Sequence, residues 1–256
     1  MAGTPDFTPP QDLLPHRRNY AEVAQGLFDL LRELCDLTPD RRVLDVGCGA
    51  GRLAGPLTGF LGPAGSYEGF DSSAERIEWC NDNIAPHHPR FRFTVADVYN
   101  GQYNPAAQTP ASEYTFPYGD GEFDVAFLTS VFTHMLPEDV THYLDEIARV
   151  LKPGGRTLIT WFLLNDDTER LLEEQKERRH DPASNAHDAL LSHHFGAYRT
   201  TNPRAPEHVM AYYEPWVRDA YRRSGLEIVE PVHFGSWAGR TQTIHNQDVL
   251  LARRPG

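Results

Sequence analysis

Short apolar runs alternate with stretches whose apolar residues recur at helical spacing along most of the chain. Apolar runs bounded by turn residues predict strands over 43–46, 67–70, 91–95, 124–128, 156–164, 226–234 and 248–252. Helical spacing predicts helices over 20–37, 52–60, 72–84, 137–151 and 214–224. Strands that alternate with helices need crossover connections, which place them in a mainly parallel sheet covered on both faces. The pattern therefore predicts a doubly wound α/β domain.

The alternation breaks down in two places. Residues 165–212 begin with a charged helical stretch, continue with many His, Pro, Asn and aromatic residues, and are interpreted as an inserted substrate lid. Residues 1–18 contain four prolines, which prevent a regular helix and predict a flexible or loosely packed N-terminal arm. Residues 19–256 show no internal repeat and are expected to form a single domain.

The charge balance restricts the possible partners. The chain carries 24 Lys and Arg against 36 Asp and Glu, a formal net charge of −12. Nucleic acids and anionic membranes are bound chiefly through Lys and Arg, so this balance argues against both. Cys35, Cys48 and Cys80 are odd in number and lack CxxC spacing, which argues against a disulfide framework or a zinc knuckle. No apolar run resembles a secretory signal or a membrane span, and a cytoplasmic protein is expected.

A glycine-rich stretch, DVGCGAG at 45–51, follows the first predicted strand. Gly47 and Gly49 allow a ligand to approach the backbone and permit backbone angles that other residues avoid. A dinucleotide-binding loop would have a third glycine at position 52, where Arg52 stands. No GxxxxGK[ST] motif follows. The stretch therefore indicates a ligand site at a strand end, but it argues against a nicotinamide dinucleotide and against a nucleoside triphosphate.

Acidic residues end three successive predicted strands, at Asp45, Asp71 and Asp97. A carboxylate at the end of the second strand can accept both hydroxyls of a ribose, which is the role expected for Asp71. Asp97 is placed to accept from an adenine amine, with the N–H of Val98 beside it. A site with three acids suits a cationic nucleoside better than one that carries phosphates. The alternative is that each Asp only caps the turn or helix that follows it.

Five segments resemble the class I S-adenosylmethionine-dependent methyltransferases, in order and at similar spacing: VLDVGCGAG, YEGFDSS, FTVADV, FDVAFLTSVFTHM and LDEIARVLKPGGRTLITWF. The resemblance runs over about 40–164. It implies a Rossmann-like sheet of seven strands whose last strand is antiparallel, and S-adenosylmethionine as the cofactor. Carried over by position, it implies that the cofactor is bound by Asp45, Gly47, Gly49, Asp71, Ser72, Asp97, Val98, Ser130 or its neighbour Thr129, and Tyr20 on the helix before the first strand.

Methyl transfer to a hydroxyl needs alignment of the reacting groups and a base that removes the proton. His134, which follows the fourth strand in LTSVFTHM, is the leading candidate for this base. The alternative is that His134 orders the turn or packs under the lid. His233 and His245 are further candidates, either as bases or as substrate ligands.

Aromatic and amide residues are expected near the mouth of the site, at Tyr99, Asn100, Tyr103, Asn104 and Trp237. Sugar rings pack on aromatic faces and sugar hydroxyls pair with amides, so these residues favour a sugar. They can equally be packing residues of the lid.

The sequence leaves a metal requirement open. Histidines crowd the inserted segment, but their spacing matches no zinc motif, and surface imidazoles of a polar lid are the simpler interpretation. They are His180, His187, His193, His194 and His208. Mg²⁺ could assist by using carboxylates such as Asp166 or Asp167, although no motif supports it.

The hypothesis that joins these observations is an O-methyltransferase acting on a hydroxyl of a small neutral acceptor. A sugar or oligosaccharide comes first, because the stretch after the fourth strand and the C-terminal segment resemble mycobacterial polysaccharide sugar O-methyltransferases. The first alternatives are a secondary-metabolite phenol, amine or carboxylate. A non-catalytic protein that binds S-adenosylmethionine is a further alternative. TSVF stands where amino-methyltransferases of DNA have [DNS]PP[YFW], which argues against methylation of DNA amino groups. The sequence leaves the oligomeric state open, with a homodimer as one option.

Overall fold

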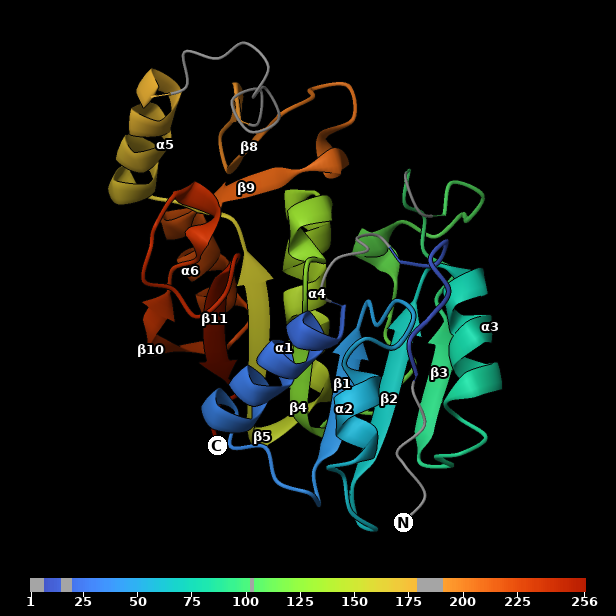
Figure 1. Cartoon of the computed structure of the whole chain (residues 1–256). Helices are drawn as coiled ribbons and strands as arrows, with labels where there is room; N and C mark the ends of the chain where they lie inside the picture. Colours follow the sequence, from blue (N-terminus) through green and yellow to red (C-terminus); the bar gives the residue numbers. More distant parts are fainter. Residues whose placement is uncertain (1–6, 15–19, 102–103, 179–190) are drawn as a thin grey trace.

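Across residues 7–14, 20–101, 104–178 and 191–256, which the computed structural model describes, the chain is built around a seven-stranded sheet (Figure 1). The strand order is β10-β11-β5-β4-β1-β2-β3. The strands are β1 (Arg42–Val46), β2 (Ser66–Asp71), β3 (Phe91–Val95), β4 (Phe123–Leu128), β5 (Leu151–Trp161), β10 (Glu227–His233) and β11 (Asp248–Arg253).

The direction of the strands confirms the predicted topology. Strands β3, β2, β1, β4 and β5 pair in parallel, whereas β11 runs antiparallel to both β5 and β10. The last strand is thus antiparallel and inserted next to the parallel part. The order reverses at β1, which pairs with β2 on one side and β4 on the other. Ligands of open α/β sheets bind outside the carboxyl ends of the strands at such a point.

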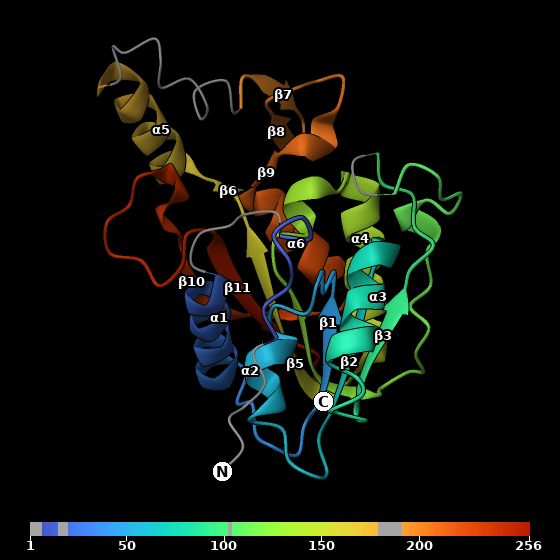
Figure 2. The same ribbon diagram turned by 45° about the vertical axis from the view of Figure 1, so that its right-hand side comes forward.

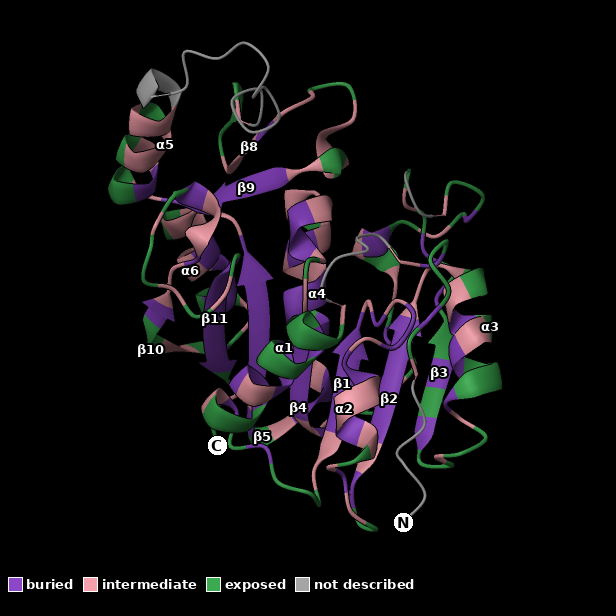
Figure 3. Cartoon of the chain, in the orientation of Figure 1, coloured by how far each residue is buried: buried purple, intermediate pink, exposed green. Residues whose placement is uncertain are grey.

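Helices cover both faces of the sheet, as expected (Figure 2). One face packs against α1 (Tyr20–Leu34), α2 (Ala54–Thr58) and α3 (Ala74–Asn83), and the other against α4 (Pro137–Val150) and α6 (Glu214–Arg223). Side chains alternate between the faces of a strand. Val43 of β1 therefore belongs to the core under α1–α3, and its neighbour Leu44 to the core under α4 and α6. Figure 3 shows these central strands buried between helices whose outer sides are exposed.

The strand expected over 156–164 is divided in two. Strand β5 ends at Trp161, and Leu163–Leu164 form β6, which pairs with β9 in a separate sheet. The N–H of Leu163 donates to the buried carboxylate of Asp248 at 2.6 Å. This contact with a residue 85 positions away fixes the chain after Phe162 in a new direction. At its other end β5 starts earlier than expected, because a register shift against β4 accommodates the Lys-Pro-Gly-Gly turn within the strand.

The described parts of the inserted segment lie beyond the carboxyl ends of the parallel strands, at the top of Figure 1. It contains α5 (Asp166–Arg178), β7 (His193–Phe195), β8 (Tyr198–Thr200) and β9 (Met210–Tyr213). In the described part of the chain, β6, β9, β8 and β7 form a four-stranded sheet in that order. The sequence pattern did not predict these strands. The lid function of 165–212 stays a prediction.

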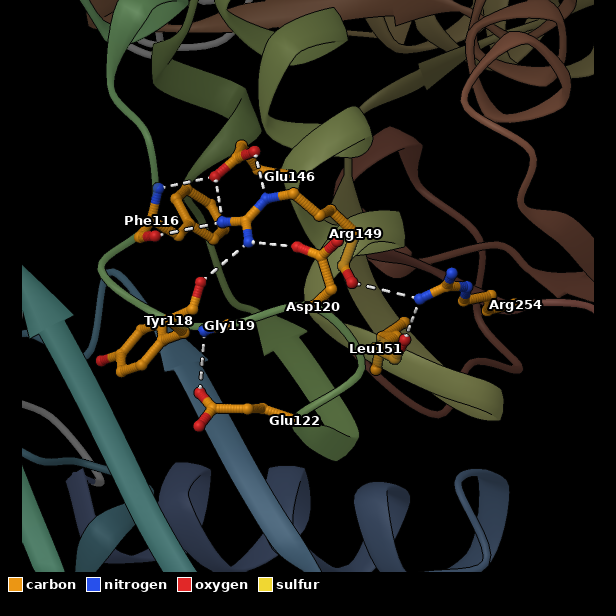
Figure 4. A network of polar contacts seen from close by, with 9 residues as sticks. All are labelled: Phe116, Tyr118, Gly119, Asp120, Glu122, Glu146, Arg149, Leu151 and Arg254. Atoms are coloured by element: carbon orange, nitrogen blue, oxygen red, sulfur yellow. Dashed lines mark hydrogen bonds and ion pairs between the residues drawn. The ribbon is translucent and has the colours of Figure 1, made fainter.

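A polar network fastens the long connection between β3 and β4 to α4 (Figure 4). One edge of the Arg149 guanidinium donates to both carboxylate oxygens of Glu146, with Nε–Oε1 and Nη2–Oε2 distances of 2.7 Å. Arg149 also donates to the carbonyls of Phe116 and Tyr118 and to the carboxylate of Asp120, at 2.8–3.1 Å. The Glu146 carboxylate in turn accepts the N–H of Phe116 at 2.6 Å. A connection without regular structure is thus fixed through its backbone groups.

Among the described residues, the helices are all too short or too polar to cross a membrane.

Candidate active site

A cavity of about 740 Å³ opens at the carboxyl ends of the parallel strands, within the usual size of small-molecule sites. Its floor is formed by residues at or just after the ends of β1, β2, β3 and β4. Other parts of the wall come from residues 13–14, α1, α3, the β3–β4 connection, the start of α4, the inserted segment and the loop before β11. Of the predicted site residues, the cavity is lined by Tyr20, Gly47, Gly49, Asp71, Ser72, Val98, Tyr99, Asn100, Thr129, Ser130, His134 and His245.

The glycine loop takes backbone angles that favour glycine. The φ angles of Gly47, Gly49 and Gly51 are +77°, +54° and +72°. A Cβ on Gly47 would lie 2.5 Å from Cγ2 of Val131, so a side chain there would collide with the loop after β4. No atom lies within 4 Å of the corresponding position on Gly49, which lines the cavity. Gly49 therefore leaves space that a bound group can use.

The carboxylate of Asp71 connects the glycine loop to the end of β2. One oxygen accepts the N–H of Gly49 and the other accepts the N–H of Ser73, both at 2.8 Å. Each carboxylate oxygen has further acceptor capacity. Asp71 lines the cavity together with Ser72, so it can accept hydroxyl groups of a ligand there.

The other two predicted acids lie outside the cavity lining. Asp45 is buried behind the glycine loop, where its carboxylate accepts the hydroxyl of Tyr67 at 2.6 Å. Burial raises the pKa of Asp45 to about 7, and the negative charge of Asp71 acts in the same direction. Asp97 is exposed, whereas its neighbours Ala96 and Val98 line the cavity. The N–H of Val98 donates to the carbonyl of Ala96 at 2.9 Å, within its own loop.

Ser130 has an unusual backbone conformation, with φ at +59°. Such a conformation costs about 1–3 kcal/mol and is often found at functional sites. Ser130 is held by two contacts of 2.8 Å, from its N–H to Oγ1 of Thr160 and from its hydroxyl to Oε1 of Gln247. Gln247 also lines the cavity and was not predicted, because nothing local in the sequence pairs it with a residue 117 positions away.

Basic residues supply positive charge on the side of the cavity formed by α1 and α3. The guanidinium of Arg52 lies 5.5 Å from the ring centre of Tyr20, whose hydroxyl donates to the carbonyl of Ala50 at 3.4 Å. Burial raises the pKa of Tyr20 well above its ordinary value. Arg52 and Arg76 both line the cavity. Sequence reasoning used Arg52 only to exclude a dinucleotide, although its place beside the glycine motif could have identified it as a residue of the cavity.

His134 ends a short 3-10 turn, η2 (Phe132–His134), and lies in the cavity wall. Its Nδ1 is 2.9 Å from the carbonyl oxygen of Glu207 in the inserted segment. A carbonyl oxygen can only accept, so this contact requires a proton on Nδ1. In the neutral ring the lone pair then lies on Nε2. Burial lowers the pKa of His134, against the opposing effect of the carbonyls of Glu207 and His208.

Of the predicted substrate residues, three line the cavity and two lie outside its lining. Tyr99, Asn100 and His245 line the cavity, and burial lowers the pKa of His245. His233, at the end of β10, is outside the lining. Trp237 is also outside: its Nε1 donates to Asp248 at 2.7 Å, and its ring packs on Phe162 at 4.9 Å. Phe162 rather than Trp237 forms the wall there.

Apolar side chains form part of the cavity wall. They are contributed by separate parts of the chain: Leu13, Leu14, Met135, Phe162 and Val209. Residues 7–14 of the expected arm thus contribute two leucines to the site, and Leu13 is 6% exposed. No helical or strand pattern indicated that these leucines would reach the site.

Within the part of the chain that the structure describes, no group of three or more His, Cys, Asp or Glu side chains is arranged to hold a metal ion. Asp166 and Asp167, suggested for Mg²⁺, are in the first turn of α5 and not in the cavity lining. His180, His187 and Tyr103 are outside the described residues.

Comparison with known proteins shows that the chain is similar in sequence to methyltransferases. Residues 43–155 match a family model described as a methyltransferase domain. The chain is 27% identical over 248 residues to the 27-O-demethylrifamycin SV methyltransferase of Amycolatopsis mediterranei (strain S699), covering 91% of this chain and 85% of that protein. It is 30% identical over 141 residues to the methyltransferase GfsG of Streptomyces halstedii, covering 54% of this chain but only 44% of that protein.

Solved structures share the fold. One is a 1,6-didemethyltoxoflavin-N1-methyltransferase from Burkholderia thailandensis, determined with 1,6-didemethyltoxoflavin and S-adenosylhomocysteine. Its TM-score is 0.53 at 19% identity, covering 93% of this chain and 79% of that chain. At this identity the likeness establishes the arrangement of the elements and no acceptor.

Proposed function

Because this chain belongs to the class I S-adenosylmethionine-dependent methyltransferases, we propose that it methylates a hydroxyl oxygen of a small neutral acceptor with a largely apolar body. The observation that carries the proposal is the position of His134. His134 lines a cavity whose walls include several apolar side chains, and its Nδ1 is held by a backbone carbonyl in the tautomer that suits a base.

The residues of the floor fit the cofactor. The space beside Gly49, the acceptor oxygens of Asp71 and the positive charge of Arg52 and Arg76 match an adenosine that carries an amino-acid group. When bound, S-adenosylmethionine supplies an electrophilic methyl group on a sulfonium. Asp71 would accept the ribose hydroxyls. Arg52 would face the carboxylate. The adenine would lie against the loop of Val98.

The chain's own part in the reaction is alignment and proton removal. The apolar wall excludes water and holds the acceptor with its hydroxyl towards His134. Nε2 of His134 would accept the hydroxyl proton as the acceptor oxygen takes the methyl group that the cofactor supplies. A buried imidazole with a lowered pKa is neutral near pH 7 and ready to accept that proton. General base catalysis of this kind typically contributes about 10²–10⁴-fold to a rate.

The acceptor's apolar character rests on the wall residues. Phe162, Met135 and Val209 present no polar side-chain group apart from the thioether of Met135, and sugars need several hydrogen-bonding partners. The sugar hypothesis drew on a resemblance to sugar O-methyltransferases and on aromatic and amide residues that include Trp237, which lies outside the cavity lining. The name of the rifamycin-modifying relative also indicates an O-demethylated compound as its acceptor. A sugar acceptor is the second candidate, supported by Tyr99 and Asn100 in the lining.

A mass-spectrometric screen for methyl gain tests the proposal. The purified chain is incubated with S-adenosylmethionine and four acceptor panels: apolar alcohols and phenols, sugars, amines, and carboxylates. Each panel is run with Mg²⁺ and with a chelator. We expect a methyl group on oxygen in the first panel and loss of that product in His134→Ala. Methylation confined to sugars would favour the second candidate. Turnover confined to amines or carboxylates, or cofactor binding without turnover in any panel, would contradict the proposal.

A further inference from the structure

The loop that carries His134 is fastened to the inserted segment on both sides of the imidazole. On one side, Nδ1 of His134 donates to the carbonyl of Glu207, which lies in the 3-10 turn η3 (Pro206–His208). On the other side, the hydroxyl of Tyr212 in β9 donates to the carbonyl of Met135, the residue after His134. Both contacts join segments that are more than 70 positions apart in the sequence.

The Glu207 carbonyl is itself held in place. Thr200, a buried residue at the end of β8, donates its hydroxyl to the carbonyl of Pro206 at 3.1 Å. The same hydroxyl accepts the N–H of Asn202 at 3.3 Å. The turn that presents the Glu207 carbonyl to the imidazole is thus anchored to the small sheet of the inserted segment. This carbonyl has the position that an orienting carboxylate has in other histidine bases.

Tyr212 is well placed to hold the other side. Its side chain is 1% exposed and packs edge-on against Trp161 at 5.6 Å between ring centres. It also stacks on Trp216 of α6 at 5.0 Å. The ring is therefore fixed by β5 and α6 of the main domain, while the hydroxyl reaches the carbonyl of Met135. Because its ring is held by these contacts, Tyr212 fixes the position of the loop that carries His134.

We propose that Tyr212 is a positioning residue for methyl transfer, which through the Met135 carbonyl holds His134 against the Glu207 carbonyl and in line with the acceptor. The inference rests on the proposed function, because it assigns to Tyr212 the task of aligning the proposed base. It also gives the inserted segment a second role besides the predicted one of a lid. A displacement of about 1 Å of a catalytic group can reduce a rate by about 10²-fold, so the single hydroxyl has a measurable effect.

The test compares Tyr212→Phe, which keeps the ring and removes the hydroxyl, with Tyr221→Phe as the matched control. Tyr221 is equally buried in α6, and its hydroxyl accepts from Trp161 Nε1 at 3.3 Å, away from the His134 loop. Single-turnover rates are measured with saturating cofactor and with an acceptor from the screen. Calorimetry gives the dissociation constant of S-adenosylmethionine. The same measurements are made for His134→Ala and for the double variant Tyr212→Phe/His134→Ala.

We expect Tyr212→Phe to lower the single-turnover rate about tenfold to hundredfold, with the cofactor dissociation constant changed by less than about twofold. Tyr221→Phe keeps the wild-type rate within about twofold. On the His134→Ala background, Tyr212→Phe has no further effect, because the group that it positions is gone. A merely structural role would instead lower the rate by the same factor in both backgrounds.

Three results would overturn the inference: a wild-type rate in Tyr212→Phe, an equal loss in both backgrounds, or an equal loss in Tyr221→Phe. An unimpaired His134→Ala would instead refute the proposed base itself, so the two failures are distinguishable. If Tyr212→Phe does not fold, Thr200→Val provides the second test, since it removes the hydroxyl that anchors the Glu207 turn. We then expect the same pattern of rate loss, again absent on the His134→Ala background, and an unchanged rate would overturn the inference.

Discussion

The carboxylate of Asp71 accepts the backbone N–H of Gly49 at 2.8 Å, which joins the end of β2 to the glycine loop. The same carboxylate also fixes the start of α3 through the N–H of Ser73. One side chain therefore sets the shape of the cavity floor and presents acceptor oxygens to a ligand there.

Replacing Asp71 with Asn should weaken S-adenosylmethionine binding about tenfold to hundredfold. The amide nitrogen of Asn cannot accept an N–H or a ribose hydroxyl, and a hydrogen bond to a charged group is worth about 1.5–3 kcal/mol. Isothermal titration calorimetry measures the change. Glu75→Gln, which removes an exposed charge in the first turn of α3, is the control and should leave the affinity unchanged. Equal affinities of wild type and Asp71→Asn would contradict the role of Asp71.

Burial of Asp45 makes stability depend on pH. Its pKa is raised to about 7, so between about pH 4 and pH 7 the folded state holds a proton that the unfolded state has released. The free energy of unfolding therefore falls as the pH rises through this window. Asp45→Asn keeps an acceptor for the Tyr67 hydroxyl but cannot titrate.

Thermal unfolding at pH 5 and pH 8 checks this prediction. The melting temperature of the wild type, taken relative to that of Asp45→Asn, should be lower at pH 8 than at pH 5. The same difference at both values would show that Asp45 titrates normally.

The sequence pattern predicted those parts of the structure that are determined by residues close together in the sequence. Apolar runs such as 91–95 became strands at the predicted residues, and the acid at the end of β2 lies at the cavity. Other features depend on contacts between distant segments. The chain turns after Trp161 because Asp248 holds the N–H of Leu163, and no local signal at either residue indicates this.

The same limit applies to the site. The carbonyl of Glu207 that contacts His134 is a backbone group, and any residue type could supply it. Conversely, Trp237 and His233 have side chains suited to a binding site, but the fold places them outside the cavity lining. Composition identifies residues capable of the chemistry, while the packing decides which of them reach it.

Arg149 should contribute strongly to stability. Arg149→Ala leaves Glu146, which is 7% exposed, without its ionic partner and frees two backbone carbonyls of the β3–β4 connection. We expect the free energy of unfolding to fall by at least about 2 kcal/mol. Arg170→Ala is the control, because the Arg170–Glu174 pair on α5 is largely exposed and should contribute much less to stability. Denaturation by urea distinguishes the two, and equal losses would refute the importance of the network.

The apolar wall should decide acceptor binding and leave the cofactor unaffected. Val209→Asp places a charge in the part of the wall that the inserted segment contributes. We expect kcat/KM for an apolar acceptor to fall at least about tenfold, since burying an unpaired charge is costly. Val95→Asp is the matched control, because Val95 is 46% exposed at the end of β3 and lies outside the cavity lining. A weaker cofactor affinity in Val209→Asp, with no change in kcat/KM for the acceptor, would contradict the prediction, because it would show that Val209 contacts the cofactor and not the acceptor.

The pH dependence of turnover should reflect a base with a lowered pKa. Because burial lowers the pKa of His134, the imidazole is neutral at pH 7–8, and the wild-type rate should be level there and fall only at more acidic pH. A rate profile with saturating cofactor and acceptor measures this. A rate that keeps rising between pH 7 and pH 8 would indicate a base of higher pKa.

The single-turnover rate of methyl transfer in His134→Ala tests the central claim most directly. With S-adenosylmethionine bound at wild-type affinity, the rate at pH 7.5 should fall by about 10²–10⁴-fold, and the acidic limb of the pH profile should disappear. A wild-type rate with the same acidic limb would contradict the claim that His134 is the base.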